Sequence, residues 1–113
     1  MSDEMTRLKG FQRRYLRAAA HPLKPLVLIG QRGVTDELVK SLIQALDQHE
    51  LVKVKFIENK NKAEKNRMIE ALQSAAEAEL VGTVGHTAIF YRQSRDLEKR
   101  RIILPRKAVD LSS

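Results

Sequence analysis

Two short apolar runs, each followed by a segment with helical spacing, constrain the fold of this chain more than any other feature. Residues 26–29 read LVLI, a continuous apolar run that predicts a strand buried on both faces. Residues 51–57 read LVKVKFI, and this alternation predicts a strand with Lys53 and Lys55 on a solvated basic face. Because each strand is followed by a helix and then another strand, the crossovers favour parallel strand pairs.

Both crossover helices are expected on the same side of the sheet, because such connections are right-handed. The first should begin after Thr35, a good N-cap followed by Asp36 and Glu37, which suit the positive end of a helix dipole. The start of the second is marked by Asn61 and Glu64, which have the spacing of a capping box. The expected inward-facing residues are Leu38, Val39, Leu42, Ile43 and Leu46 in the first helix, and Met68, Ile69, Leu72, Ala75 and Ala76 in the second.

Another helix is predicted near the N-terminus, ahead of the first strand. Ser2 or Asp3 can cap it, and the prolines of HPLKP, residues 21–25, end it. Apolar residues recur at three- and four-residue steps, so the expected buried face consists of Met5, Leu8, Phe11, Tyr15, Ala18 and Ala19. The opposite face is almost wholly cationic and consists of Arg7, Lys9, Arg13, Arg14 and Arg17.

A hairpin completes the predicted sheet. Residues 80–84 and 87–91 have the composition of strands, and a turn near Gly85 and His86 separates them. The order of elements is therefore helix, strand, helix, strand, helix, strand, strand. With 113 residues, the chain is long enough for one domain with a core of its own. Together these elements predict a two-layer α/β sandwich.

The loop after the first strand is flanked by Gly30 and Gly33, with Gln31 and Arg32 between them. It is not a Walker A loop, because Gly33 is followed by Val34 rather than lysine, and it lacks the third glycine of a dinucleotide fingerprint. A glycine-flanked loop entering a helix N-terminus can attract an anion through free backbone N–H groups. KH-type modules clamp a nucleic-acid backbone with such a loop. A plain structural turn would have the same sequence pattern.

Positive charge is segregated along the chain. The net charge is +7 and the pI is near 10.0, an excess that favours polyanionic partners. Of the 21 lysines and arginines, six lie in residues 1–24, six in 53–67 and seven in 92–107. Arg32 stands alone at the tip of the glycine loop, whereas residues 68–91 contain neither Lys nor Arg. Each basic run alone could be a solvated face, but together they favour a surface for nucleic acid.

Several classes of function are disfavoured. The chain has no cysteine, which excludes disulfides, thiolate metal sites and a cysteine nucleophile. His21, His49 and His86 lack ligand spacing, and no pair of acid–base carboxylates stands out, so we expect no metal, cofactor, small-molecule substrate or catalysis. Aromatic residues are only 4% of the chain, which favours backbone binding over base stacking. No apolar stretch approaches the ~20 residues of a membrane span, and we expect a cytoplasmic protein without a membrane partner.

Four segments of the chain carry a resemblance to a known family: AHPLKPLVLIGQRGVTDELV, HELVKVKF, VGHTAIFYR and ILPR. In this order they resemble the stand-alone bacterial CRM domains, which are the YhbY-like proteins. The abbreviation CRM stands for chloroplast RNA splicing and ribosome maturation. The resemblance covers roughly residues 7–107 and implies one RNA-binding domain over 1–107, with a short tail over 108–113. It implies a fold similar to the C-terminal domain of bacterial translation initiation factor three, with a four-stranded mixed sheet and an added N-terminal helix.

The resemblance also implies a function. Bacterial members associate with precursors of the large ribosomal subunit, so ribosomal RNA is the expected partner and ribosome assembly the expected role. The family's RNA-contacting loop corresponds to Gly30, Gln31, Arg32 and Gly33. From charge, we expect the contact to extend to Arg13, Arg14, Arg17 and Lys24, and to Lys53 and Lys55 only if that face of the sheet is uncovered.

Two other functions remain open from the sequence. The glycine loop is compatible with a small enzyme or nucleotide-binding protein, and the positive charge is compatible with binding to double-stranded DNA. The sequence shows no exposed apolar stripe that lacks an assigned partner, which favours a monomer.

Overall fold

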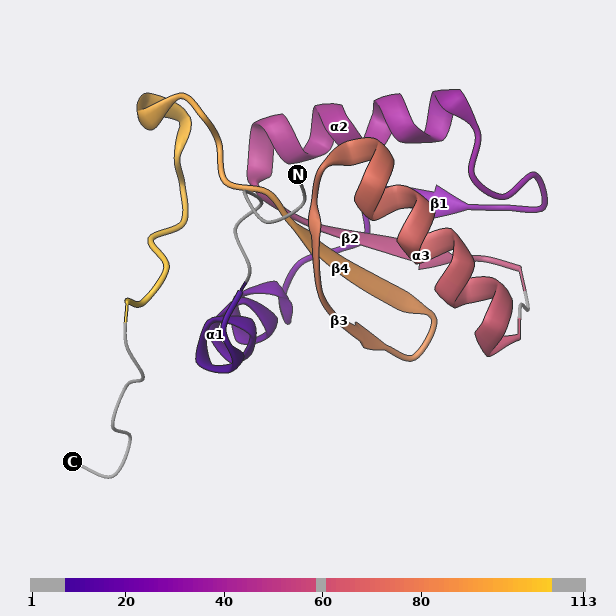
Figure 1. Cartoon of the computed structure of the whole chain (residues 1–113), viewed down its shortest axis with the longest axis horizontal. Helices are drawn as coiled ribbons and strands as arrows, with labels where there is room; N and C mark the ends of the chain where they lie inside the picture. Colours follow the sequence, from indigo (N-terminus) through magenta and orange to yellow (C-terminus); the bar gives the residue numbers. More distant parts are fainter. Residues whose placement is uncertain (1–7, 59–60, 107–113) are drawn as a thin grey trace.

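Four strands form one mixed sheet at the centre of the molecule (Figure 1). The computed structural model describes residues 8–58 and 61–106. The strands are β1 (Val27–Ile29), β2 (Leu51–Phe56), β3 (Glu79–Val84) and β4 (Thr87–Tyr91), in the order β1-β2-β4-β3 across the sheet. The predicted mixed sheet and hairpin are confirmed. Only β1 and β2 pair in parallel, because β4 lies between β2 and β3 and is antiparallel to both.

Two helices, α2 (Asp36–His49) and α3 (Lys62–Ala76), cover one face of this sheet (Figure 1). The crossover rule predicted this arrangement, and the shared core confirms it. Phe90 of β4, the largest of the fully buried side chains, lies in one cluster with residues of both helices and of β1 and β2. The helix residues buried in that cluster are Leu42, Leu46, Ile69, Leu72 and Ala76, whereas Ala75, predicted to face inward, is exposed.

Both helices begin at the predicted caps. The Thr35 hydroxyl accepts a hydrogen bond of 3.1 Å from the Leu38 N–H, and the Asn61 side chain accepts one of 2.8 Å from the Glu64 N–H. Each of these bonds satisfies a donor that has no partner inside the helix. The start of α2 is therefore fixed directly behind the glycine loop.

The remaining helix, α1 (Gly10–Ala20), packs on the opposite face of the sheet. It begins at Gly10, so the predicted start near residue 2 is wrong for Leu8 and Lys9, which are not helical; Ser2, Asp3, Met5 and Arg7 lie outside the described residues. The predicted buried face is correct for Leu8, which is buried, but wrong for the second half of the helix. Leu16 and Ala20 are fully buried, whereas Tyr15, Ala18 and Ala19 are exposed. The buried face is set by contact with Leu51, Val81, Ile89 and Tyr91 on the sheet.

Only part of this second sheet face is covered by α1. Val27 and Ile29 of β1 point into the core beneath α2 and α3, but Leu28 between them is 53% exposed. The expectation that this run is buried on both faces is therefore wrong. A continuous apolar run does not reveal whether a layer covers its second face, and here no described segment covers Leu28 fully.

After β4, residues 92–106 pass the end of α2 and then turn towards α1 at the same end of the molecule (Figure 1). Glu50, fully buried at the C-terminus of α2, accepts hydrogen bonds from the backbone N–H groups of Ser94, Arg101 and Ile102 at 2.6, 2.7 and 3.0 Å. Ile102 and Leu104 pack against the cluster around α1. This basic segment is thus part of the fold, because one carboxylate satisfies three of its backbone donors.

Tyr91 lies beside this anchor, at the end of β4. Its hydroxyl is buried and has no hydrogen-bond partner among the described residues. Burial raises the pKa of Tyr91 to about 12, and the Glu50 carboxylate adds to the rise while Arg100 opposes it. The phenol is therefore neutral at physiological pH and acts as a large apolar side chain in the core.

Candidate nucleic-acid interface

The glycine loop forms a tight turn that projects beyond the end of the sheet, between β1 and α2 (Figure 1). The Gly33 N–H donates a hydrogen bond of 3.0 Å to the Gly30 carbonyl, which closes the turn. Gln31 and Arg32 form its exposed tip. Arg32 makes no hydrogen bond or ion pair with any residue in the described part of the chain, so its guanidinium is available to an external anion.

The two glycines of the turn have different roles. Gly33 has a φ of +71°, which side-chain-bearing residues rarely adopt, and a Cβ there would lie 3.3 Å from the Met68 Cε of α3. Gly30 has no positive φ, and a Cβ there would make only an ordinary contact of 3.5 Å with Ile57. Of the two glycines, the backbone conformation of the turn therefore requires only the one at position 33.

A shallow pocket of about 480 Å³ lies between the turn and the first turn of α2. Its lining includes the whole glycine loop and also Asp36 and Glu37. The N-terminus of a helix attracts anions, but these two exposed carboxylates repel them at the same place. A bound phosphate is therefore favoured at the Gln31–Arg32 tip rather than directly over the helix N-terminus.

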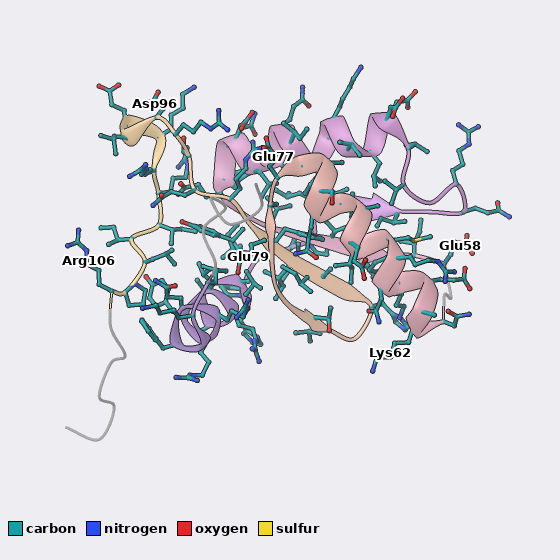
Figure 2. The ribbon with its side chains drawn as sticks, viewed as in Figure 1. Glu58, Lys62, Glu77, Glu79, Asp96 and Arg106 are labelled. Atoms are coloured by element: carbon teal, nitrogen blue, oxygen red, sulfur yellow. The ribbon has the colours of Figure 1, made fainter. Side chains whose placement is uncertain are left out.

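The cations of α1 fall into two groups. Arg13, predicted to lie on the free outer face, pairs instead with Glu79 of β3 at 3.1 Å, and the same carboxylate oxygen accepts the Leu8 N–H at 2.6 Å. Figure 2 shows Glu79 where β3 passes α1. Arg14 and Arg17 are exposed. Arg13 therefore helps to hold α1 on the sheet, while Arg14 and Arg17 are available to a ligand.

Lysines predicted on the sheet also differ in role. The Lys53 ammonium donates hydrogen bonds to the carbonyls of His21 and Leu23, at 3.2 and 2.9 Å. It therefore satisfies backbone acceptors at the C-terminal end of α1. Lys55 is exposed, on the part of the face that α1 leaves open. Lys24 is exposed in the connection between α1 and β1. The sheet face around Lys55 is therefore uncovered, as an RNA contact there requires, whereas the Lys53 ammonium already has partners.

One side-chain contact, between α3 and the turn of the β3–β4 hairpin, was not predicted from the sequence. The Lys65 ammonium of α3 lies 2.7 Å from the Nδ1 atom of His86 and 6.0 Å from the centre of the Phe56 ring. An ammonium can only donate, so His86 accepts through this nitrogen. Residues 62–65 begin α3 and residues 85–86 turn the hairpin, so only the folded sheet brings the two side chains together. No local sequence signal could have found this contact.

Three of the six basic side chains described in residues 92–106 have partners within the protein. Arg92 pairs with Asp47 and donates to the Ala76 carbonyl at 2.9 Å. Arg100 and Arg101 donate to the carbonyls of Ser94 and Gln48, at 2.8 and 2.7 Å. The side chains of Arg95, Lys99 and Arg106 are exposed and have no hydrogen-bond or ion-pair partner among the described residues, so free cations lie in this segment as well as on α1, at Lys55 and at the loop tip.

Other kinds of site find no support in the described part of the chain. Residues 8–58 and 61–106 contain no group of three or more His, Asp or Glu side chains that could hold a metal ion. No helix among them is long and apolar enough to cross a membrane. The described surface offers exposed guanidinium and ammonium groups on α1, at Lys55 and at the tip of the glycine turn.

Residues 8–92 match the family model of the CRS1 / YhbY (CRM) domain. The chain belongs to this family. The CRM match spans the sheet, all three helices and the glycine turn, and it confirms the family resemblance found in the sequence. It ends before most of the segment that is anchored on Glu50.

Two relatives of this CRM protein are similar to it over nearly their whole length. The "Probable RNA-binding protein YqeI" of Bacillus subtilis is 39% identical over 98 residues, covering 87% of this chain and 99% of the relative. A protein of Haemophilus influenzae named "RNA-binding protein" is 37% identical over 103 residues, covering 91% of this chain and 100% of the relative. The solution structure of SAV1595 from Staphylococcus aureus superposes with a TM-score of 0.73 at 34% identity, covering 88% of this chain and 100% of that one, and confirms the fold.

Proposed function

We propose that this protein binds RNA and contacts the RNA backbone through the Gly30–Gly33 turn and the neighbouring basic surface. The observation that carries the proposal is Arg32, exposed without a partner in the described structure at the tip of a turn that only a glycine at position 33 permits. Arg14, Arg17, Lys24 and Lys55 extend the cationic surface. The names of the relatives, and the net charge of +7, support RNA as the polyanion.

We further propose that the RNA is ribosomal RNA in precursors of the large subunit, and that the protein assists ribosome assembly in the bacterial cytoplasm. In this proposal residues 1–107 act as one RNA-binding domain, the protein is a monomer, and it has no catalytic activity of its own. Co-sedimentation of the protein with large-subunit precursors in cell extract, and its release at high salt, would support this role.

RNA affinity measured across a salt series tests the contact at the turn. Each phosphate neutralised contributes a slope of about 0.7 for single strands, or about 0.9 for duplexes, in log affinity against log salt. We expect Arg32→Ala to reduce the slope by about one such contribution, and Arg95→Ala, at an exposed arginine far from the turn in sequence, to leave it unchanged. An unchanged slope for Arg32→Ala would remove the turn from the interface.

Two comparisons separate RNA binding from the other functions left open by the sequence. Binding of ATP or GTP by the purified protein would favour a nucleotide-binding protein. Competition between RNA and double-stranded DNA at matched salt would show which polymer is preferred. The proposal requires preference for RNA and no measurable nucleotide binding.

A further inference from the structure

One row of side chains across the sheet is left open on the face that carries α1. The strand register aligns Leu28 of β1 with Lys55 of β2, Lys55 with Thr87 of β4, and Thr87 with Val84 of β3. Directly paired residues point to the same face, so these four side chains form one continuous row. Leu28 and Val84 are 53% and 59% exposed, and Lys55 is also exposed.

The next row along the strands is covered, and it marks the edge of the open surface. Ile89 is only 1% exposed, and the Arg17 guanidinium lies against Gly82, where an added Cβ would be 3.4 Å from the Nε atom. Gly82 and Ile89 are paired, and Lys53 is the partner of Ile89 on the other side. The helix α1 therefore forms a wall along the open row.

A groove of about 700 Å³ runs between this wall and the open row. Its lining comprises Arg14, Arg17, Ala18, His21, Lys53, Val84, Thr87 and Ile89. The lining combines cations along the helix with aliphatic groups on the sheet, and it contains no carboxylate. Such a surface suits a polyanion that also carries flat apolar groups.

The open row also leads to the glycine turn. Ile57 follows β2 and is 55% exposed, and its Cδ1 atom lies 3.5 Å from where a Cβ on Gly30 would be. Lys53, Lys55 and Ile57 point to the same face by strand alternation, and four residues of strand span about 13 Å. A ligand lying along β2 therefore reaches from the α1 groove to the turn without crossing a covered part of the sheet.

We propose that the open row receives unpaired bases of single-stranded RNA, while Arg14, Arg17 and Lys55 contact the phosphates on either side. The inference rests on the proposed RNA binding and adds the kind of RNA that is bound. In a duplex the bases are stacked and paired, so their faces cannot lie on the sheet. The scarcity of aromatic residues does not oppose this arrangement, because burial of aliphatic surface against a base is itself favourable.

A second copy of this chain is the other possible occupant of the apolar row. Two such copies would bring Arg14, Arg17 and Lys55 of one molecule close to those of the other, and each chain carries a net charge of +7. Like charges brought together across an interface oppose association. Charge complementarity therefore favours RNA.

The experiment compares three RNA ligands: a single strand, the same backbone without bases over its central positions, and a duplex. We expect the wild-type protein to bind the single strand about tenfold more tightly than the abasic strand at fixed salt. The double variant Leu28→Ser, Val84→Ser should remove this difference and leave abasic binding unchanged. The matched control is Leu97→Ser, at an apolar residue that is 72% exposed in η2 (Leu97–Lys99), away from the sheet.

A second variant tests the same surface by gain of affinity. Val84→Phe adds an aromatic ring to an exposed strand position, where aromatic residues are well tolerated. Since bases stack on aromatic rings, we expect binding of the single strand to strengthen about tenfold, with no change for the duplex. Thermal melts of every variant identify any that have lost the native fold.

The outcomes distinguish this inference from the proposed function. Absence of RNA binding by the wild-type protein would overturn both. Equal binding of the single and abasic strands, unaffected by all three sheet substitutions, would overturn only the role of the open row. Dimers that dissociate in the Leu28→Ser, Val84→Ser variant, with RNA affinity unchanged, would assign the row to a second copy instead.

Discussion

The Glu50 carboxylate accepts a hydrogen bond of 2.7 Å from the backbone N–H of Arg101, 51 positions further along the chain. The other oxygen of the same carboxylate accepts the Ser94 N–H, and the group is fully buried. A single side chain at the end of α2 thus fixes the path of residues 92–106.

Replacement of Glu50 by glutamine should therefore detach this segment. In Glu50→Gln one oxygen becomes an NH₂ group that faces backbone donors, so we expect a loss of about 3 kcal/mol in the free energy of unfolding. Urea denaturation measures the loss, and limited proteolysis within 92–106 locates it. The matched control is Glu77→Gln. Glu77 ends α3 as Glu50 ends α2, with a φ of 51°, but its side chain is exposed. Equal stability of the two variants would contradict the anchoring role.

The arginines at positions 13 and 14 should separate stability from binding. Arg13 pairs with Glu79, so Arg13→Gln should lower the free energy of unfolding by about 0.5–1 kcal/mol. Arg14 is exposed and lines the groove, so Arg14→Gln should weaken RNA binding and leave the thermal midpoint nearly unchanged. Thermal melts and RNA titrations on both variants test the distinction, and a reversed pattern would show that the two roles are wrongly assigned.

The two glycines of the turn should respond differently to alanine. Gly33→Ala places a side chain at φ +71°, which costs roughly 1–2 kcal/mol, whereas Gly30→Ala meets only ordinary contacts. Chemical denaturation should show a clear loss of stability for the first variant and little change for the second. Similar losses for both would mean that the turn constrains position 30 in a way that its backbone angle and contacts do not reveal.

The carboxylates beside the turn should limit RNA affinity. Asp36→Asn and Glu37→Gln remove negative charge from the pocket wall, so RNA binding should strengthen, most at low salt. Each change should also cost about 0.3–1 kcal/mol of stability, because an acidic group at a helix N-terminus is favourable. The control is Glu70→Gln, at an exposed glutamate of α3. If affinity rises equally in all three variants, the effect is one of net charge alone.

Tyr91 should make the protein less stable at alkaline pH. Its folded-state pKa is raised to about 12, above the value of 10.0 for a free tyrosine, so the folded state keeps the proton more tightly. This contribution is complete below pH 10 and is lost as the pH rises towards 12, because the unfolded chain ionises first. Tyr91→Phe should flatten the fall in stability over that range. Denaturation of both proteins at pH 8, 10 and 11 measures the difference, and parallel curves would contradict it.

Local signals in the sequence were sufficient for much of the fold. Thr35 and Asn61 cap α2 and α3 as predicted, and the hairpin turn lies at Gly85 and His86. These features depend on residues within one turn of each other. The glycine loop and its exposed arginine could be found for the same reason, although the sequence could not show that Gly33, and not Gly30, has a positive φ.

The incorrect predictions concern features that are fixed by distant contacts. Helix α1 is rich in alanine and arginine, so more than one face has acceptable spacing, and the sheet selects the face with Leu16 and Ala20. The exposure of Leu28 depends on how far α1 extends across the sheet. The sequence of β1 contains no information on that distance. The expectation that no exposed apolar stripe exists fails for the same reason. Glu50 likewise has no local signal, since its partners lie more than 40 positions away.

The strand order has a consequence for how the chain is made. Synthesis proceeds from the N-terminus, and β4 is the last strand to emerge, yet it fills the gap between β2 and β3. Until residues 87–91 are available, β2 keeps one unpaired edge and β3 has no neighbour in the sheet. A nascent chain halted before Thr87 therefore presents additional open strand edges, which promote aggregation, and gains the continuous four-stranded sheet only when β4 inserts between β2 and β3.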